Sequence, residues 1–272
     1  MLGAIAGDII GSVYEGKVAW QSARTPHFKP LFHPLARFTD DTVLTIAVAE
    51  SILHGGDLVD LFKDYASSYP SAGYGGDFRR WAASESRHPY NSWGNGAAMR
   101  VSPVGFAYDS LDEVLLRAKW TAEVTHDHPE GVKGANATAA AIYLARTGSG
   151  KDEIRDYIER KFAYRLDKSI DDIRPGFTFQ VSCQATVPPA IIAFLESTDY
   201  EHAVRLAVSL GGDSDTIACI AGGIAQAYYG GVPAEIRDQS LGRLDDRLRS
   251  VVKEFEDQFR LNAGLDEQAP DD

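Results

Sequence analysis

The chain has almost no cysteine. Only Cys183 and Cys219 occur among its 272 residues, and neither belongs to a paired-cysteine motif. A disulfide framework and a cysteine-based zinc site are therefore poor explanations of how this sequence folds. Such sparing use of cysteine is typical of a protein that works in a reducing compartment.

Positive charge is also in short supply. Lysine and arginine number 27 against 39 aspartate and glutamate residues, so the formal net charge is −12. This balance argues against a general nucleic-acid or anionic-membrane binder, although it leaves room for a local basic pocket. The apolar stretch 1–16 has no basic leader, is interrupted by Asp8 and is rich in glycine, so it predicts neither a signal peptide nor a membrane span. We expect a cytoplasmic protein.

Strand-like alternation, linkers and repeats are scarce as well. The best strand candidate is the short segment 176–183 (GFTFQVSC), and no Pro/Ser-rich linker or fixed-period repeat divides the chain. The sequence therefore predicts one all-α domain over residues 1–262. The polar C-terminal tail 263–272 is expected to fray.

Helical periodicity, by contrast, recurs along the whole chain. Residues 40–56 (DDTVLTIAVAESILHGG) begin with two acids, continue apolar with helical spacing and stop at a Gly-Gly pair. Many of these segments are rich in alanine and glycine, whose small side chains let helices pack closely around a shared centre. Similar patterns predict helices at 57–70, 110–126, 131–148, 151–164, 186–198, 199–212, 214–231 and 245–261.

Two of the predicted helices begin with acids and hydroxyls, at residues 39–42 (TDDT) and 213–216 (DSDT). Helix capping explains one such side chain, because Asp, Ser and Thr are favoured N-caps and acids are stabilised near a helix N-terminus. Capping needs only one side chain, however, and each site supplies two carboxylates. Oxygen ligands without a nearby histidine or cysteine suit Mg²⁺, Mn²⁺ or Ca²⁺, as a single ion or a two-metal centre.

A phosphatase of the haloacid dehalogenase type is the rival interpretation of residues 203–216. There, an apolar strand would precede an Asp-x-Asp nucleophile loop. In this chain Thr216 directly follows the second aspartate, and the alternating strand–helix pattern of that fold is missing. A Mg²⁺-dependent phosphohydrolase is therefore kept only as a further alternative.

Seven segments occur in an order that resembles the ADP-ribosylglycohydrolase family, across about residues 1–230. They are GAIAGDIIGSVYE, FTDDT, GYGGDF, NSWGNGAAMR, the TH pair at 125–126, QATVPPAIIAFLES and LGGDSDTIACIAGGIA. The family includes the dinitrogenase-reductase-activating glycohydrolases and the serine-type ADP-ribosyl hydrolases. The resemblance implies an all-α orthogonal multi-helix bundle, a single compact domain with a binuclear metal site in a central cleft. It also implies hydrolysis of the C1″ bond between ADP-ribose and an acceptor.

The resemblance also implies a metal site with two Mg²⁺ ions, or Mn²⁺ in their place. The first ion would be held by Thr39, Asp40 and Asp41, and the second by Asp213 and Thr216, with Asp215 bridging or shared. Glu15 would lie beside the metals. Glu15, Asp40 or Asp41 would take the proton from water, and Glu15 and Asp41 are the catalytic candidates. Without the resemblance, Glu15 would be interpreted as a solvated loop residue.

Substrate-binding residues follow in the same way. Glycines at 94 and 96 let backbone amides approach a phosphate, and Trp93 offers a flat face for adenine or ribose. On composition alone this stretch is an ordinary glycine turn with a core tryptophan. By resemblance the ligand would be held by Gly75, Ser92, Trp93, Gly94, Asn95, Gly96 and His126.

The sequence says less about the acceptor group from which ADP-ribose would be released. Residues 71–93 resemble the glycine-rich stretch of the serine-type branch more than that of the arginine-type branch, which favours an O-linked substrate, such as ADP-ribosylserine or O-acetyl-ADP-ribose. Arginine-linked, nucleic-acid-linked and other ADP-ribosylated protein or small-molecule substrates stay open, because a fold does not fix its leaving group. A non-catalytic ADP-ribose-binding or structural descendant is the alternative function. We expect a monomer that does not bind membranes.

Overall fold

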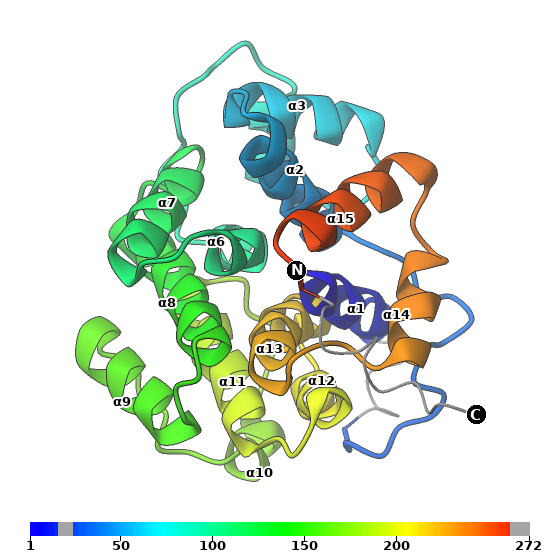
Figure 1. Ribbon diagram of the computed structural model, residues 1–272, viewed down its shortest axis with the longest axis vertical. Coiled ribbons are helices and arrows are strands. Elements are labelled where there is room, and N and C mark those ends of the chain that lie inside the picture. The colour runs from blue at the N-terminus through cyan, green and yellow to red at the C-terminus, as the bar shows by residue number, and fades with distance from the viewer. Residues whose placement is uncertain (16–23, 262–272) are drawn as a thin grey trace.

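Every regular element that the computed structural model describes, in residues 1–15 and 24–261, is a helix (Figure 1). The described residues hold no strand; one isolated bridge joins Gly94 to Ser182, and one 3-10 turn spans Arg174–Gly176. The helices are α1 (Leu2–Gly11), α2 (Asp40–His54), α3 (Leu58–Ser68), α4 (Gly76–Ala82), α5 (Gly96–Met99), α6 (Ser102–Ala107), α7 (Leu111–Glu123), α8 (Pro129–Arg146), α9 (Lys151–Phe162), α10 (Ile170–Ile173), α11 (Cys183–Glu196), α12 (Tyr200–Ser209), α13 (Ser214–Tyr229), α14 (Ala234–Leu241) and α15 (Asp246–Gln258).

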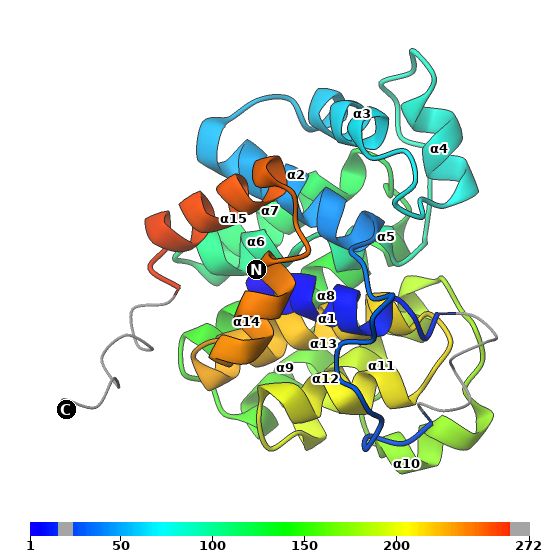
Figure 2. The same ribbon diagram turned by 90° about the vertical axis from the view of Figure 1, so that its right-hand side faces the viewer.

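Helices α1 and α13 form the centre of the molecule and lie side by side in both views (Figures 1 and 2). Glycines at every fourth position of α1 face α13. A Cβ on Gly7 would lie 2.0 Å from the Ala218 carbonyl oxygen, and one on Gly11 would lie 2.6 Å from the Asp215 Cα. No larger residue fits at these positions, since the two backbones touch there. This contact brings the start of α13 beside the C-terminal half of α1.

The start of α2 is built by conventional capping. Thr39 is the N-cap in an extended conformation, and its side chain accepts a hydrogen bond from the Asp41 amide. The helix ends at Gly55, whose φ of 75° few other residues tolerate. Capping therefore explains Thr39 but leaves Asp40 and Asp41 without a role in the helix end.

The start of α13 differs. Asp213 occupies the N-cap position, but its side chain makes no capping hydrogen bond. It accepts instead from the Asn95 side-chain amide at 2.6 Å. The capping interpretation is therefore wrong for Asp213, whose carboxylate is directed at the residues preceding α5.

The remaining helices surround this centre. Helices α2, α3 and α15 pack on one side, α7 and α8 on another, and α11 and α12 cover α13 from below in the view of Figure 1. Cys183 and Cys219 are both buried and free. In the part of the chain that the structure describes, no helix is long and apolar enough to cross a membrane.

The all-α, single-domain architecture predicted from the sequence is confirmed. The expected helices are present, with ends shifted by a few residues, and α1 and several short helices were not predicted. The strand expected at 176–183 is wrong: the segment begins in the turn at Arg174–Gly176 and makes only one bridge. The domain boundary at 262 stays a prediction, because the tail 263–272 lies outside the described residues.

Candidate active site

A cavity of about 360 Å³ opens where the N-terminal ends of α2, α5 and α13 converge. The chain following α1, residues 72–78 at the start of α4, His126 after α7 and the segment before α11 also contribute to its wall. Among the residues expected from the sequence, those lining it are Glu15, Thr39, Asp40, Asp41, Gly75, Ser92, Gly94, Asn95, Gly96, His126, Asp213, Asp215 and Thr216. Segments separated by about 200 residues therefore meet at one site, as the two acidic helix starts predicted.

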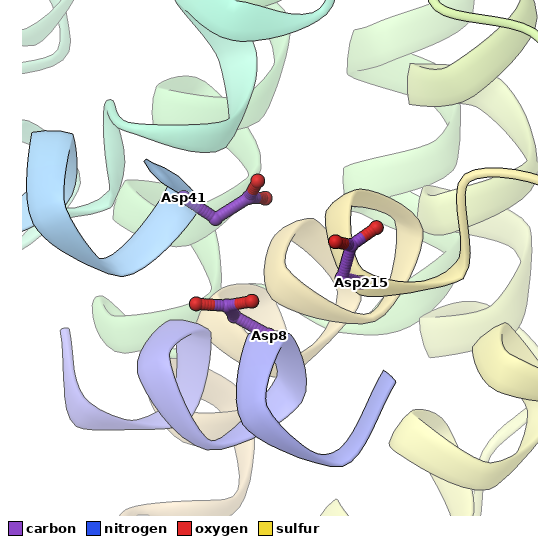
Figure 3. A group of neighbouring side chains, drawn as sticks. All are labelled: Asp8, Asp41 and Asp215. Atoms are coloured by element: carbon purple, nitrogen blue, oxygen red, sulfur yellow. The ribbon is translucent and has the colours of Figure 1, made fainter. Parts of the chain in front are cut away.

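The carboxylates at the floor of this cavity form two groups. Asp8, Asp41 and Asp215 each offer an oxygen within 4.8 Å of the others, and so do Glu15, Asp213 and Asp215. Figure 3 shows the first group: the three side chains come from α1, α2 and α13 and surround a common space. Asp215 belongs to both groups, which is the position expected for a ligand shared by two ions.

Asp8 organises the site from beneath. Its carboxylate accepts hydrogen bonds from the amide and hydroxyl of Thr39, at 2.9 and 2.7 Å, and from the amide of Thr42 at 3.1 Å. The Thr42 hydroxyl is a fourth donor. These contacts fix the first turn of α2 onto α1. The Asp8 role was not predicted, although a buried acid inside an apolar helix must have partners.

The carboxylates that face the cavity accept fewer hydrogen bonds than Asp8 does. Asp41 Oδ2 accepts from the Thr216 hydroxyl at 3.2 Å, which links the two helix starts directly. The other oxygen, Asp41 Oδ1, is buried and has no hydrogen-bond partner. Asp215 accepts from the Thr216 amide at 2.9 Å. The Asp41 carboxylate thus has unused acceptor capacity at the point where the two helix starts meet.

Uncompensated negative charge dominates the electrostatics of the site. None of the ion pairs among the described residues includes these five carboxylates or that of Asp40. Burial, followed by the charge of Asp8, raises the pKa of Asp40 to about 8. Burial and the neighbouring acids raise the pKa values of Asp41 and Asp215 well above their usual range. Burial and the charge of Asp213 also raise the pKa of Glu15.

The donor set fits hard divalent cations. All the candidate ligands are carboxylate or hydroxyl oxygens, which Mg²⁺ and Mn²⁺ prefer over the nitrogen and sulfur ligands typical of zinc. The unsatisfied Asp41 Oδ1 and the raised pKa values both indicate that a positive charge is needed here before all the acids ionise. The acidic cluster could therefore hold metal.

The glycine-containing loop before α5 forms another part of the wall. It is held against the segment before α11 by the Asn95 amide, which donates to the Val181 carbonyl at 2.7 Å. A Cβ on Gly96 would lie 3.1 Å from His126 Nε2, and one on Gly94 would lie 3.4 Å from the same atom. A side chain at position 96 would press against the imidazole, so glycine favours the close approach of the loop to His126.

Trp93 is the one expected site residue that does not line the cavity. Its side chain is 54% exposed, and its ring centroid lies 5.5 Å from that of His128. The sequence pattern did not reveal that Tyr90, Phe179 and Val181 line the cavity instead. Phe179 and Val181 lie in the segment first interpreted as a strand. A contact between Trp93 and adenine or ribose stays a prediction.

Comparison with known proteins gives a consistent result. The family model described as ADP-ribosylglycohydrolase matches residues 1–265. The mouse ADP-ribosylhydrolase ARH3 is 28% identical over 85% of this chain and 82% of its own length, and the human protein is 27% identical over 85% and 84%. The ADP-ribosylarginine hydrolase Tri1 of Pseudomonas putida is 31% identical, but over 52% of this chain and 40% of its own.

A solved structure described as an ADP-ribosylglycohydrolase-related protein complex superimposes with a TM-score of 0.69 and 26% identity, covering 96% of both chains. The same all-α architecture is therefore present in a protein of that family. Together with the family match over nearly the whole sequence, this establishes that the chain belongs to the ADP-ribosylglycohydrolase family and is a hydrolase of ADP-ribose glycosidic bonds.

Proposed function

We propose that the protein is a Mg²⁺-dependent hydrolase that cleaves the C1″ bond between ADP-ribose and an O-linked acceptor, such as serine, and releases ADP-ribose. The observation that carries this proposal is the two clusters of carboxylates that share Asp215, at a cavity that a glycine-containing loop also lines. An anionic ligand held by that loop would extend toward the acids.

The residues that would hold the two cations are those at the acidic helix starts. Thr39, Asp40 and Asp41 would bind one ion, and Asp213 and Thr216 the other, with Glu15 beside them and Asp215 shared. Bound divalent cations would orient the distal ribose hydroxyls and make water easier to deprotonate. Mn²⁺ would serve in place of Mg²⁺ because it accepts the same oxygen ligands.

The side chains would carry out the remaining steps. Glycosidic cleavage passes through an oxocarbenium-like state, in which negative charge near C1″ is stabilising. Glu15 or Asp41 would take the proton of the attacking water. Glu15 is exposed at the edge of the cavity and its pKa is raised, both of which suit a group that exchanges protons with solvent. Asn95 donates to Asp213 and would keep that carboxylate facing the site.

The preference for an O-linked acceptor rests on residues 71–93, which resemble the serine-type branch. Arginine-linked ADP-ribose is the second candidate, because the P. putida relative is an ADP-ribosylarginine hydrolase by name. That relative matches about half of this chain, whereas the ARH3 proteins match 85%. The match to the arginine-type relative is therefore partial and gives the second candidate limited support.

Release of ADP-ribose from matched serine-linked and arginine-linked peptides, with Mg²⁺ or with EDTA, tests the proposal. We expect release from the serine-linked peptide only, and its loss in EDTA. Release from the arginine-linked peptide alone would overturn the acceptor preference. Undiminished release in EDTA would contradict the metal requirement.

Alanine variants separate turnover from binding. Asp40→Ala, Asp41→Ala and Asp215→Ala should each lose turnover through loss of metal, and full Mg²⁺-dependent activity in any of them would contradict the assignment. If the wild-type protein binds ADP-ribose but hydrolyses none of these conjugates, the non-catalytic alternative becomes the better description.

A further inference from the structure

Arg100 is a fully buried cation in the wall of the cavity. Its guanidinium lies 4.5 Å from the Phe62 ring centroid, and Nη2 donates to the Thr121 carbonyl at 2.9 Å and to the Thr125 hydroxyl at 2.8 Å. No ion pair among the described residues includes Arg100. Its strongest polar interactions therefore go to neutral oxygens at the end of α7.

Thr125 connects this cation to the imidazole of His126. Its hydroxyl oxygen lies 2.7 Å from His126 Nδ1 while accepting from Arg100. A hydroxyl has one proton and two lone pairs, so accepting from a cation strengthens it as a donor to its other neighbour. The imidazole itself is 5% exposed, with Nε2 turned toward Gly94 and Gly96 at the cavity wall.

Tyr90 is the competing acceptor for the Thr125 proton, since its phenol also interacts with Thr125. A neutral phenol oxygen is a much weaker base than an imidazole nitrogen, so the proton should go to His126 Nδ1. Burial and the Arg100 charge lower the pKa of His126 well below its usual range, which leaves one proton on the ring. That proton must then reside on Nε2.

We infer that Arg100 and Thr125 are positioning residues that hold His126 in the neutral tautomer protonated at Nε2, so that it donates a hydrogen bond to an oxygen of the ligand beside the glycine loop. This rests on the proposed function only for the identity of the ligand, an ADP-ribose phosphate or hydroxyl oxygen. A ring that donates from Nε2 and accepts at Nδ1 cannot serve as the base in the cavity. General-base chemistry is thereby left to the carboxylates that line the cavity.

Side-chain ¹⁵N NMR of histidine-labelled protein at neutral pH reads the tautomer directly. The chain has seven histidines, and His126→Asn identifies the signal of interest. We expect the wild-type signal of a ring protonated at Nε2. Thr125→Val, which keeps the shape but removes the hydroxyl, should introduce the second tautomer, and Thr125→Ser should restore the wild-type signal.

Calorimetric titration with ADP-ribose gives the second measurement. Thr125→Val should weaken ADP-ribose binding by about tenfold, the effect expected when one hydrogen bond to a charged group of the ligand is lost. Thr125→Ser should bind ADP-ribose as tightly as the wild type. A wild-type ring protonated at Nδ1 would overturn the inference, as would a Thr125→Val protein that matches wild type in both tautomer and affinity. The tautomer is measured without ligand and without turnover. The NMR result therefore tests this inference even if the proposed function proves wrong.

Discussion

At the scale of single residues, the site combines acids with two different tasks. Asp8 has four donors and holds the turn that carries Thr39 and Thr42, whereas one oxygen of Asp41 has no hydrogen-bond partner. A carboxylate already saturated by hydrogen bonds is poorly suited to bind metal as well. Asp8 therefore organises the ligands, although it lies within reach of the same space.

Substituting Asp8→Asn tests this role. The amide keeps the shape but faces four donors with only one acceptor oxygen, so the free energy of unfolding should fall by about 1–3 kcal/mol in saturating Mg²⁺. Urea unfolding measures the change. The exposed Asp112→Asn is the matched control and should change stability by less than about 0.5 kcal/mol. An Asp8→Asn protein as stable as wild type would argue against the organising role.

How far single residues could be predicted depends on what the local pattern reveals. The acids and hydroxyls of residues 39–42 and 213–216 stood out because they interrupt apolar helices, and all but Thr42 and Ser214 line the cavity. Asp8 interrupts a helix too, but its partners lie more than 30 residues away and no local pattern names them. Phe179 and Thr125 gain their positions only from tertiary packing, which explains why neither was assigned a role.

At the scale of elements, close packing of α1 on α13 brings the acids together. The glycines of α1 let the two backbones touch, so the start of α13 lies beside Asp8. The alanine- and glycine-rich composition did predict close packing around a shared centre. The strand at 176–183 was wrong because alternation in a short segment does not guarantee a partner strand: this segment finds a single bridge to the glycine loop.

The Gly7→Ala substitution tests that packing. Its Cβ would lie 2.0 Å from the Ala218 carbonyl oxygen, so the helices must separate, and we expect a loss of about 3 kcal/mol or more in unfolding free energy together with weaker Mg²⁺ binding. Thermal and urea unfolding measure the first effect, and calorimetry the second.

Gly223→Ala on α13 is the matched control. Its nearest neighbour would be Ser102 Cβ at 3.4 Å, an ordinary contact, and alanine favours a helix over glycine by about 1 kcal/mol. It should be neutral or stabilising. Equal effects of the two substitutions would contradict the claim that backbone contact at Gly7 positions the site.

At the scale of the whole molecule, the acidic site should make stability depend on pH and metal. Asp40 has a pKa raised to about 8, and the pKa values of Asp41 and Asp215 are raised well above their usual range. Acids whose pKa is higher in the folded than in the unfolded state bind protons more tightly when folded, so stability falls as pH rises toward and through the folded pKa. The Met1 amine, whose pKa is lowered to about 4, has the opposite effect on the pH dependence of stability, but it is one group against several acids.

In EDTA, therefore, the melting temperature should fall between about pH 6.5 and about pH 8, a window above the ordinary histidine pKa. Saturating Mg²⁺ should raise the melting temperature most at the upper end, where the acids are closest to ionised. Differential scanning calorimetry at matched ionic strength measures both. Asp215→Asn should flatten the EDTA profile, and a wild-type profile that rises with pH in EDTA would contradict this account.

The most direct test of the central claim is anomalous diffraction from crystals soaked in Mn²⁺. The account predicts two peaks in the cavity, about 3.5–4 Å apart as in two-metal sites, with Asp215 contacting both and Asp8 contacting neither. A peak pair that excludes Asp215, or no peak among these acids at saturating Mn²⁺, would contradict it.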